Sequence, residues 1–215
     1  CREVIEELNR KHSSSYGDKF FLCHRSREWN PAEGVWMGHE RKRGKLEEFN
    51  RLLCERDAET TYIHIEGDLL RTLDEQPVTY VITLDADTRL PPNSARELAQ
   101  TAAHPLNRPI YNRQLGRIDR GYGIIQPRIS IPPDASRKSH FSRIFSGNVG
   151  LDPYASVVSD IYQDLKGEAI FTGKGIYDVQ AFHRVMDNRL PENRVLSHDL
   201  LESTYLRAGF ASRIE

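Results

Sequence analysis

The sequence has few cysteines and almost no net charge. Its 215 residues include three cysteines, and 30 Lys and Arg offset 31 Asp and Glu to a net charge of −1. Cys1, Cys23 and Cys54 form no CxxC pair and lack a histidine at zinc-binding spacing, which argues against a disulfide scaffold or a structural zinc site. Cysteines of this kind suit a reducing compartment. The lack of excess positive charge argues against a nucleic-acid partner.

The sequence also lacks a long hydrophobic run. Its longest clean apolar stretch, residues 80–84, is far short of the roughly 20 residues that a membrane span needs. We therefore expect no membrane contact by this chain. The chain starts at Cys1 without a basic-then-apolar leader, and we expect it to be a piece of a longer protein.

What is present predicts one large α/β domain. At about 150 residues per domain the length corresponds to about 1.4 domains. Residues 1–18 are expected to form a helix and a loop, and residues 19–215 the core. Apolar runs predict buried strands at 78–84 and 123–131 and a short strand at 20–24. Helical spacing predicts helices at 2–12, 40–53, 94–103, 153–165, 178–186 and 199–208, the last ending at Gly209. Residues 28–38 are expected to be irregular, and 106–120 a loop or hairpin. This alternation predicts a mostly parallel sheet with flanking helices.

The first candidate site is Asp85-Ala86-Asp87, directly after the strongest predicted strand. Ligands of open α/β sheets bind beyond the carboxyl ends of strands. Two carboxylates there can share a hard divalent cation that clamps a diphosphate. A turn or helix cap is the structural alternative. A second alternative is a phosphohydrolase of the haloacid dehalogenase type, but that pattern requires Thr or Val where Arg89 stands.

The second candidate is the basic segment Arg41-Lys42-Arg43-Gly44-Lys45. Cations around a glycine at a helix start suit a phosphate or nucleotide. The alternative is a solvated basic face. Because cations are unfavourable at a helix N-terminus, we expect some partner to offset them.

Two later segments carry further candidates. One segment, Phe171-Thr172-Gly173-Lys174-Gly175, is similar to a phosphate-binding P-loop. Its glycine spacing is wrong, however, and Gly175 stands where a P-loop requires Ser or Thr. The remaining interpretations are an acceptor-binding loop and a tight turn. The other segment is Ser197-His198-Asp199-Leu200-Leu201-Glu202, in which Asp199 stands at the start of a predicted helix. Asp199 is expected to be either a helix cap or a general base. A Ser/His/Asp triad is rejected, because adjacent residues rarely converge on one bond and no GxSxG elbow exists. His198 alone suits a structural role.

The order of these segments resembles the inverting, processive glycosyltransferases with the GT-A fold. More closely, the glycosyltransferase domain of the cyclic β-1,2-glucan synthases is similar over most of residues 20–215. The strings that carry this resemblance are Trp29-Asn30-Pro31, residues 33–38, residues 40–50 and residues 157–164. They are much more specific than an acidic pair.

The resemblance implies transfer of glucose from UDP-glucose to the 2-hydroxyl of a growing β-1,2-glucan, with inversion. Asp85 and Asp87 would hold Mg²⁺ or Mn²⁺, and Asp199 would be the base. The implied nucleotide-sugar contacts are Lys42, Arg41, Lys45, Gln126 and Arg128. The implied acceptor contacts are Gly173, Lys174, His198 and Glu202. The phosphohydrolase is the second hypothesis, and a catalytically silent carbohydrate-binding module is the third.

The resemblance also implies a larger parent protein at the cytoplasmic face of a bacterial inner membrane. The first strand of the GT-A fold should precede Cys1, and the Gln-x-x-Arg-Trp motif should follow Glu215. We therefore expect a GT-A-like domain that is incomplete at both ends and inactive alone.

Overall fold

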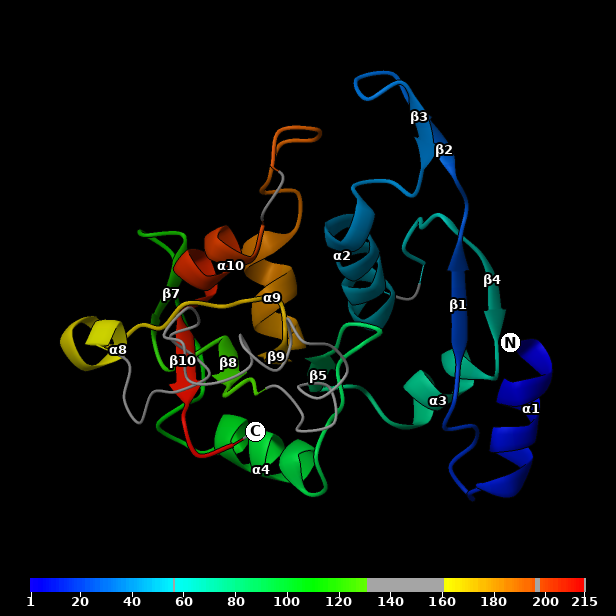
Figure 1. Cartoon of the computed structure of the whole chain (residues 1–215), viewed down its shortest axis with the longest axis horizontal. Helices are drawn as coiled ribbons and strands as arrows, with labels where there is room; N and C mark the ends of the chain where they lie inside the picture. Colours follow the sequence, from blue (N-terminus) through cyan, green and yellow to red (C-terminus); the bar gives the residue numbers. More distant parts are fainter. Residues whose placement is uncertain (56, 131–160, 196–197, 215) are drawn as a thin grey trace, which may run out of the picture. The chain divides into compact units, whose positions relative to one another are not determined.

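The computed structural model describes residues 1–55, 57–130, 161–195 and 198–214. The chain divides into two compact units (Figure 1). The N-terminal unit comprises Cys1–Thr79 and Phe182–Leu196, and the sheet unit comprises Tyr80–Ala181 and Ser197–Glu215. The expectation of a single domain stays a prediction, because one domain can contain two such units.

The N-terminal unit contains a two-stranded antiparallel sheet and a separate hairpin. Its elements are α1 (Arg2–Lys11), β1 (Leu22–Arg25), β2 (Glu28–Asn30), β3 (Val35–Met37), α2 (Arg41–Cys54), β4 (Tyr62–Glu66) and α3 (Leu69–Glu75). β1 pairs with β4, and β2 pairs with β3. Leu52 of α2 packs with Leu69 and Leu73 of α3 to form the core of this unit.

The hairpin β2–β3 replaces the irregular stretch expected at 28–38, so that expectation was wrong. Trp29 lies opposite Trp36 in the register, and their rings meet edge to face with centroids 6.1 Å apart. Asn30 closes the turn, since its Oδ1 accepts the N–H groups of Ala32 and Glu33. Cross-strand aromatic pairs stabilise short hairpins, which is how three-residue strands persist here.

The sheet unit is built on four strands in the order β10-β8-β9-β5. Its elements are β5 (Tyr80–Thr83), α4 (Ser94–Ala103), β6 (Ile110–Asn112), β7 (Arg117–Arg120), β8 (Ile124–Pro127), α8 (Ile161–Lys166), β9 (Gly175–Asp178), α10 (Asp199–Leu206) and β10 (Ala208–Ala211). Between β9 and α10, α9 (Val179–Met186) starts in this unit and continues into residues of the other. β6 and β7 form a hairpin, which is one of the two structures expected for residues 106–120.

Strand directions bring several chain ends to one edge of this sheet. β10 and β8 are parallel, whereas β9 is antiparallel to both β8 and β5. β5, β8 and β10 therefore run in the same direction. Their carboxyl ends and the amino end of β9 share one edge, which we call the carboxyl edge. The Arg128 N–H, just past β8, donates to the Ile214 carbonyl, just past β10, at 2.8 Å.

The expected α/β class is confirmed, but the described sheet is not mostly parallel. Only one of its three strand pairings is parallel, because β9 inserts between β8 and β5 in the opposite direction. β8 is buried throughout, as predicted, whereas β5 buries only Thr83 fully. Residues 153–160 of the expected helix lie outside the described residues. Within the described ranges, no helix is long and apolar enough to cross a membrane.

The last predicted helix ends earlier than expected. α10 ends at Leu206, and Gly209 belongs to β10 instead of a helix cap. A Cβ on Gly209 would lie 2.9 Å from the Tyr122 ring, so packing of the strand explains this glycine. Leu206, Ala208 and Phe210 continue the apolar pattern of the helix, which hid the strand.

The core of the sheet unit fixes the chain around the carboxyl edge. Leu98 and Ala102 of α4 pack on Ile125 of β8 and Ile176 of β9. Figure 1 shows α4 beside these strands. Because α4 follows β5 directly, this packing holds both ends of the connecting segment, residues 84–93.

Candidate functional site

Asp85 and Asp87 lie at the carboxyl edge, where β5 ends. The Thr88 N–H donates to the Asp85 carbonyl at 3.0 Å, which turns the chain away from the strand. The Asp85 carboxylate pairs with Lys174 Nζ at 2.8 Å. Lys174 precedes β9 directly, so pairing of β9 with β5 brings it to this carboxylate. The structure thus places in contact two predicted site residues that had been assigned to different ligands.

Gln126 shapes the loop before β9 from inside the core. Its side chain is fully buried, and its Oε1 accepts from the Thr172 N–H at 3.0 Å and the Thr172 hydroxyl at 3.1 Å. Its Nε2 donates to the Pro127 carbonyl. These contacts favour a positioning role for Gln126 over the predicted nucleotide-sugar contact.

Backbone geometry explains why glycine occupies two positions of this loop. Gly173 has a φ of +81°, in the left-handed region that favours glycine. A Cβ on Gly175 would lie 2.5 Å from the Ile125 carbonyl oxygen, so β8 and β9 can approach only with glycine there. The segment that evoked a P-loop is therefore a tight turn that presents Lys174 at the carboxyl edge.

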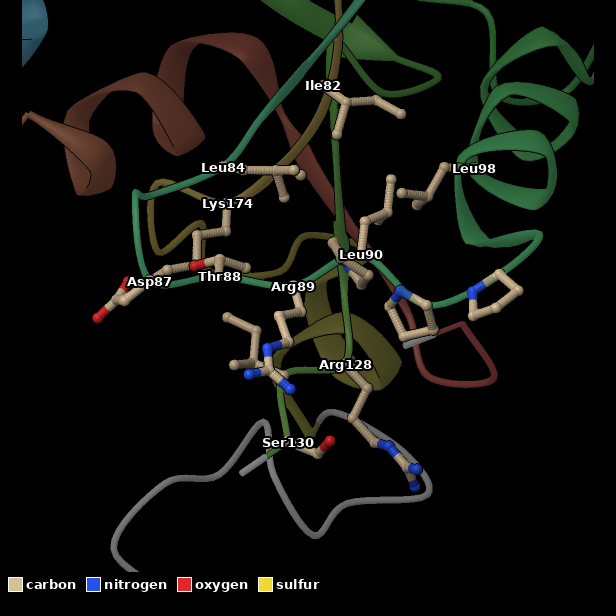
Figure 2. Close-up of a pocket in the computed structure, with 15 residues that line it drawn as sticks. Ile82, Leu84, Asp87, Thr88, Arg89, Leu90, Leu98, Arg128, Ser130 and Lys174 are labelled. Carbon is tan, nitrogen blue, oxygen red and sulfur yellow. The ribbon is translucent and has the colours of Figure 1, made fainter. Parts of the chain in front are cut away.

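A pocket of about 590 Å³ opens beside these residues (Figure 2). Among the described residues, its charged lining consists of one carboxylate, Asp87, and three cations: Arg89, Arg128 and Lys174. Figure 2 shows Arg89, Arg128 and Ser130 in the same part of the pocket, whereas the Asp87 carboxylate lies apart from both arginines. The apolar walls come from Ile82, Leu84, Leu90, Pro91, Pro92, Leu98, Pro127 and Ile129. Apolar walls with a few convergent charges are typical of a small-molecule site, and the surplus of cations suits an anion.

The residues at this edge also suit a divalent cation. Carboxylate oxygens are the donors that Mg²⁺ and Mn²⁺ take, and cations nearby suit the phosphate oxygens that would complete the shell. The Lys174 ammonium occupies one side of Asp85, so an ion there would have to displace it or use the other oxygen. The donor set fits the expected ion.

A second polar cluster stands at the start of α10. His198 Nδ1 lies 2.8 Å from Glu202 Oε1 and 3.5 Å from Asp199 Oδ1. His198 and Glu202 are buried, and Asp199 is partly exposed. His198 is the N-cap residue and makes no capping hydrogen bond through its side chain, while Asp199 is the first helical residue. The capping role considered for Asp199 therefore does not describe it. Asp199 does not line the pocket beside Asp87.

Carboxylates of the N-terminal unit offset the basic segment. Arg41 pairs with Glu33, and the buried Arg43 pairs with Glu40 at 2.6 Å and with Glu47 at 3.3 Å. Internal partners thus meet the expectation of offsetting charge. A Cβ on Gly44 would lie 2.1 Å from the His39 carbonyl oxygen, which explains this glycine without a ligand.

Lys42 and Lys45 are the other two cations of this segment for which a nucleotide contact was predicted. Lys42 is partly exposed, and Lys45 is exposed. Both belong to the N-terminal unit, whereas Asp85 and Asp87 belong to the sheet unit. Their contact with a nucleotide stays a prediction.

Sequence reasoning missed Arg89 as a site residue. It had been weighed only as a departure from the phosphohydrolase pattern, yet it lines the pocket with Thr88 and Ser130. Its position in the polar loop after β5, two residues beyond Asp87, was the available signal.

Fold and site define a mixed α/β protein with an acidic pair and clustered cations at one edge of its sheet. No protein-family model matches the chain. Over its whole length, aligned on 216 residues, it is 45% identical to a segment of the cyclic beta-(1,2)-glucan synthase NdvB of Rhizobium meliloti (strain 1021). It spans about 7% of the length of that relative. The resemblance to the cyclic β-1,2-glucan synthases is confirmed by this identity.

Proposed function

We propose that this chain is part of a glycosyltransferase domain that moves glucose from UDP-glucose to the 2-hydroxyl of a growing β-1,2-glucan. The observation that carries the proposal is 45% identity, along the entire chain, to a protein named as a cyclic glucan synthase. Asp87 and three cations around a pocket at the carboxyl edge are consistent with a nucleotide diphosphate there. A GT-A arrangement and a membrane-bound parent protein belong to the same proposal.

In the proposed donor site, Arg89, Arg128 and Lys174 face the diphosphate. Hydrogen bonds from cations to phosphate oxygens are stronger than neutral ones, and they stabilise the charge that develops on departing UDP. A Mg²⁺ or Mn²⁺ ion on Asp85 and Asp87 would supply further neutralisation of this leaving group. Because Lys174 contacts Asp85, we now assign it to the donor phosphates instead of the acceptor.

In the proposed chemical step, Asp199 takes the proton of the acceptor 2-hydroxyl. As that O–H bond breaks, the oxygen attacks the anomeric carbon, and the bond from that carbon to the UDP oxygen breaks on the opposite face. Proton transfer to a positioned carboxylate contributes typically 10²–10⁴-fold to such a rate. Gly173, His198 and Glu202 keep their proposed roles near the acceptor.

A UDP titration of the intact protein, with and without Mn²⁺, tests the donor site. We expect Mn²⁺-dependent UDP binding that weakens at least about tenfold, or about 1.4 kcal/mol, in Asp85→Asn and in Asp87→Asn. The matched control is Asp119→Asn in the β6–β7 hairpin, where Asp119 accepts from Asn112 at 2.8 Å. This control should bind UDP as the unmodified protein does.

Three outcomes separate the alternatives. Absence of UDP binding would overturn the proposal. Release of phosphate from simple phosphomonoesters without a nucleotide sugar would favour the phosphohydrolase. Binding of UDP without any transfer by the intact protein would favour a catalytically silent module.

A further inference from the structure

The cluster at the start of α10 has the geometry of a metal-ligand set. One atom from each of His198, Asp199 and Glu202 lies within 4.8 Å of the others. An ion about 2.0–2.2 Å from each ligand atom needs those atoms about 2.9–3.5 Å apart. The measured separations from His198 Nδ1, 2.8 Å to Glu202 Oε1 and 3.5 Å to Asp199 Oδ1, are close to that requirement.

Within the part of the chain that the structure describes, two buried oxygens in this cluster lack hydrogen-bond partners. The Glu202 side chain is 3% exposed, and its Oε2 accepts no hydrogen bond. Asp199 Oδ1 is also buried without one. Leaving a buried carboxylate oxygen unsatisfied costs the desolvation free energy of that atom. Both oxygens belong to carboxylates that contact the His198 ring, so a cation bound by these carboxylates would lie close to both oxygens.

Charge at the cluster favours a cation as well. Among the described residues, no Lys or Arg forms an ion pair with Asp199 or Glu202, and His198 is the partner of both. Two carboxyl groups stand against one imidazole, so acidic side chains outnumber the basic one in this cluster. This differs from the carboxyl edge, where cations outnumber the acidic pocket residue.

We propose that His198 Nδ1 and the carboxylates of Asp199 and Glu202 bind a divalent first-row transition-metal ion of the Zn²⁺ or Co²⁺ type. Imidazole nitrogen suits these ions, whereas Mg²⁺ and Ca²⁺ prefer sites made only of oxygen. Spacing within the first turn of α10 places residues 198 and 202 on one helix face, which presents two ligands together. The site is distinct from the cation proposed for Asp85 and Asp87.

One consequence rests on the proposed function. An ion on Asp199 Oδ1 occupies the carboxylate that takes the proton of the acceptor, so metal binding here inhibits transfer. Metal binding itself does not depend on that role and can be measured without UDP or substrate.

The test is a Zn²⁺ titration by calorimetry of the full protein carrying Asp85→Asn and Asp87→Asn, so that only the α10 cluster is compared. We expect one Zn²⁺ site that weakens about tenfold or more when His198→Ala or Glu202→Gln is added. The matched control is His183→Ala, which removes another histidine–glutamate contact, His183 Nε2 to Glu55 Oε1 at 3.0 Å. This control should keep the site.

Other results would overturn the proposal. These are Zn²⁺ affinity unchanged in His198→Ala and Glu202→Gln, no Zn²⁺ site in the unsubstituted cluster, or Mg²⁺ bound as tightly as Zn²⁺. If either variant does not fold by circular dichroism, the other decides. Visible absorption of added Co²⁺ gives an independent reading, since bands that change on binding support the site and an unchanged aqueous Co²⁺ spectrum contradicts it. UDP binding is measured separately, so failure of one proposal leaves the other standing.

Discussion

At the scale of single residues, the contact between Asp85 and Lys174 sets the charge at the carboxyl edge. The two side chains are 37% and 26% exposed, so water screens their attraction and a ligand can compete for either group. An ammonium at this position can hold Asp85 in place before binding and contact phosphate oxygens afterwards. The pair therefore links the acidic residues to the loop before β9.

Replacing Lys174 tests that link. In Lys174→Met, we expect UDP binding to weaken about tenfold, because one charged contact to the diphosphate is lost. Fluorescence or calorimetric titration of UDP in Mn²⁺ measures the change. Lys166→Met provides the comparison, since Lys166 is exposed on α8 and does not line the pocket. Equal UDP affinity in Lys174→Met and the unmodified protein would refute this role.

Glu40 gives a pH prediction for the N-terminal unit. Burial alone would raise its pKa, but hydrogen bonds from the Asn193 N–H and Arg43, with the charges of Arg43 and His39, lower the pKa below its ordinary 4.5. Because the folded state holds the carboxylate form more strongly, this group stabilises the fold above about pH 4.5. That contribution is lost as the pH falls through the lowered pKa.

The measurement is urea unfolding of the unmodified chain and of Glu40→Gln between pH 7 and pH 3. The stability advantage of the unmodified chain should be constant at neutral pH and shrink on acidification. A difference that does not change with pH across this range would show that the Glu40 charge contributes nothing.

At the scale of elements, the packing of α4 on β8 and β9 supports the site. Leu98 is fully buried in this core and also lines the pocket. The helix thereby joins the stability of the sheet unit to the shape of the wall beside Asp87.

Truncation of Leu98 should therefore affect both stability and binding. Leu98→Ala is expected to lower the free energy of unfolding by about 2–5 kcal/mol, since it leaves a cavity in the core. Leu106→Ala removes the same atoms from a side chain that is 81% exposed and should change stability by at most about 0.5 kcal/mol. Denaturant titration compares the two. Similar losses in both variants would show that α4 does not anchor the core.

Many of the helices and strands could be predicted because their periodic or apolar sequence runs are long. The helices at 41–54 and 94–103 and the strand at 80–83 carry clear periodic or apolar runs. β9 and β10 have only four residues each, and their apolar character merges with the neighbouring helices. Strand direction has no local signal at all, so antiparallel β9 could not have been foreseen.

The same reason limited the prediction of the site. Asp85 and Asp87 were predictable because acidic residues stood directly after a strong strand. Contact of Asp85 with Lys174 depends on β9 pairing beside β5, and burial of Gln126 depends on β8 lying inside the sheet between β10 and β9. Neither property can be obtained from spacing along the chain.

At the scale of the whole molecule, the net charge of −1 combines three different local situations. Two cations of the basic segment, Arg41 and Arg43, pair with glutamates of the N-terminal unit. Cations outnumber the carboxylate around the pocket at the carboxyl edge, and carboxylates outnumber the imidazole at the start of α10. Separate regions of each sign suit a protein that handles an anionic donor and also a proton or a metal ion.

The most direct test of the central proposal is incorporation of labelled glucose from UDP-glucose into β-1,2-glucan by the intact protein and by its Asp199→Asn variant. We predict that the unmodified protein forms labelled glucan. The variant should lose transfer by at least about 10²-fold while it still binds UDP, because only proton removal is lost. Undiminished transfer by Asp199→Asn, or no transfer from UDP-glucose by the unmodified protein, would contradict the account.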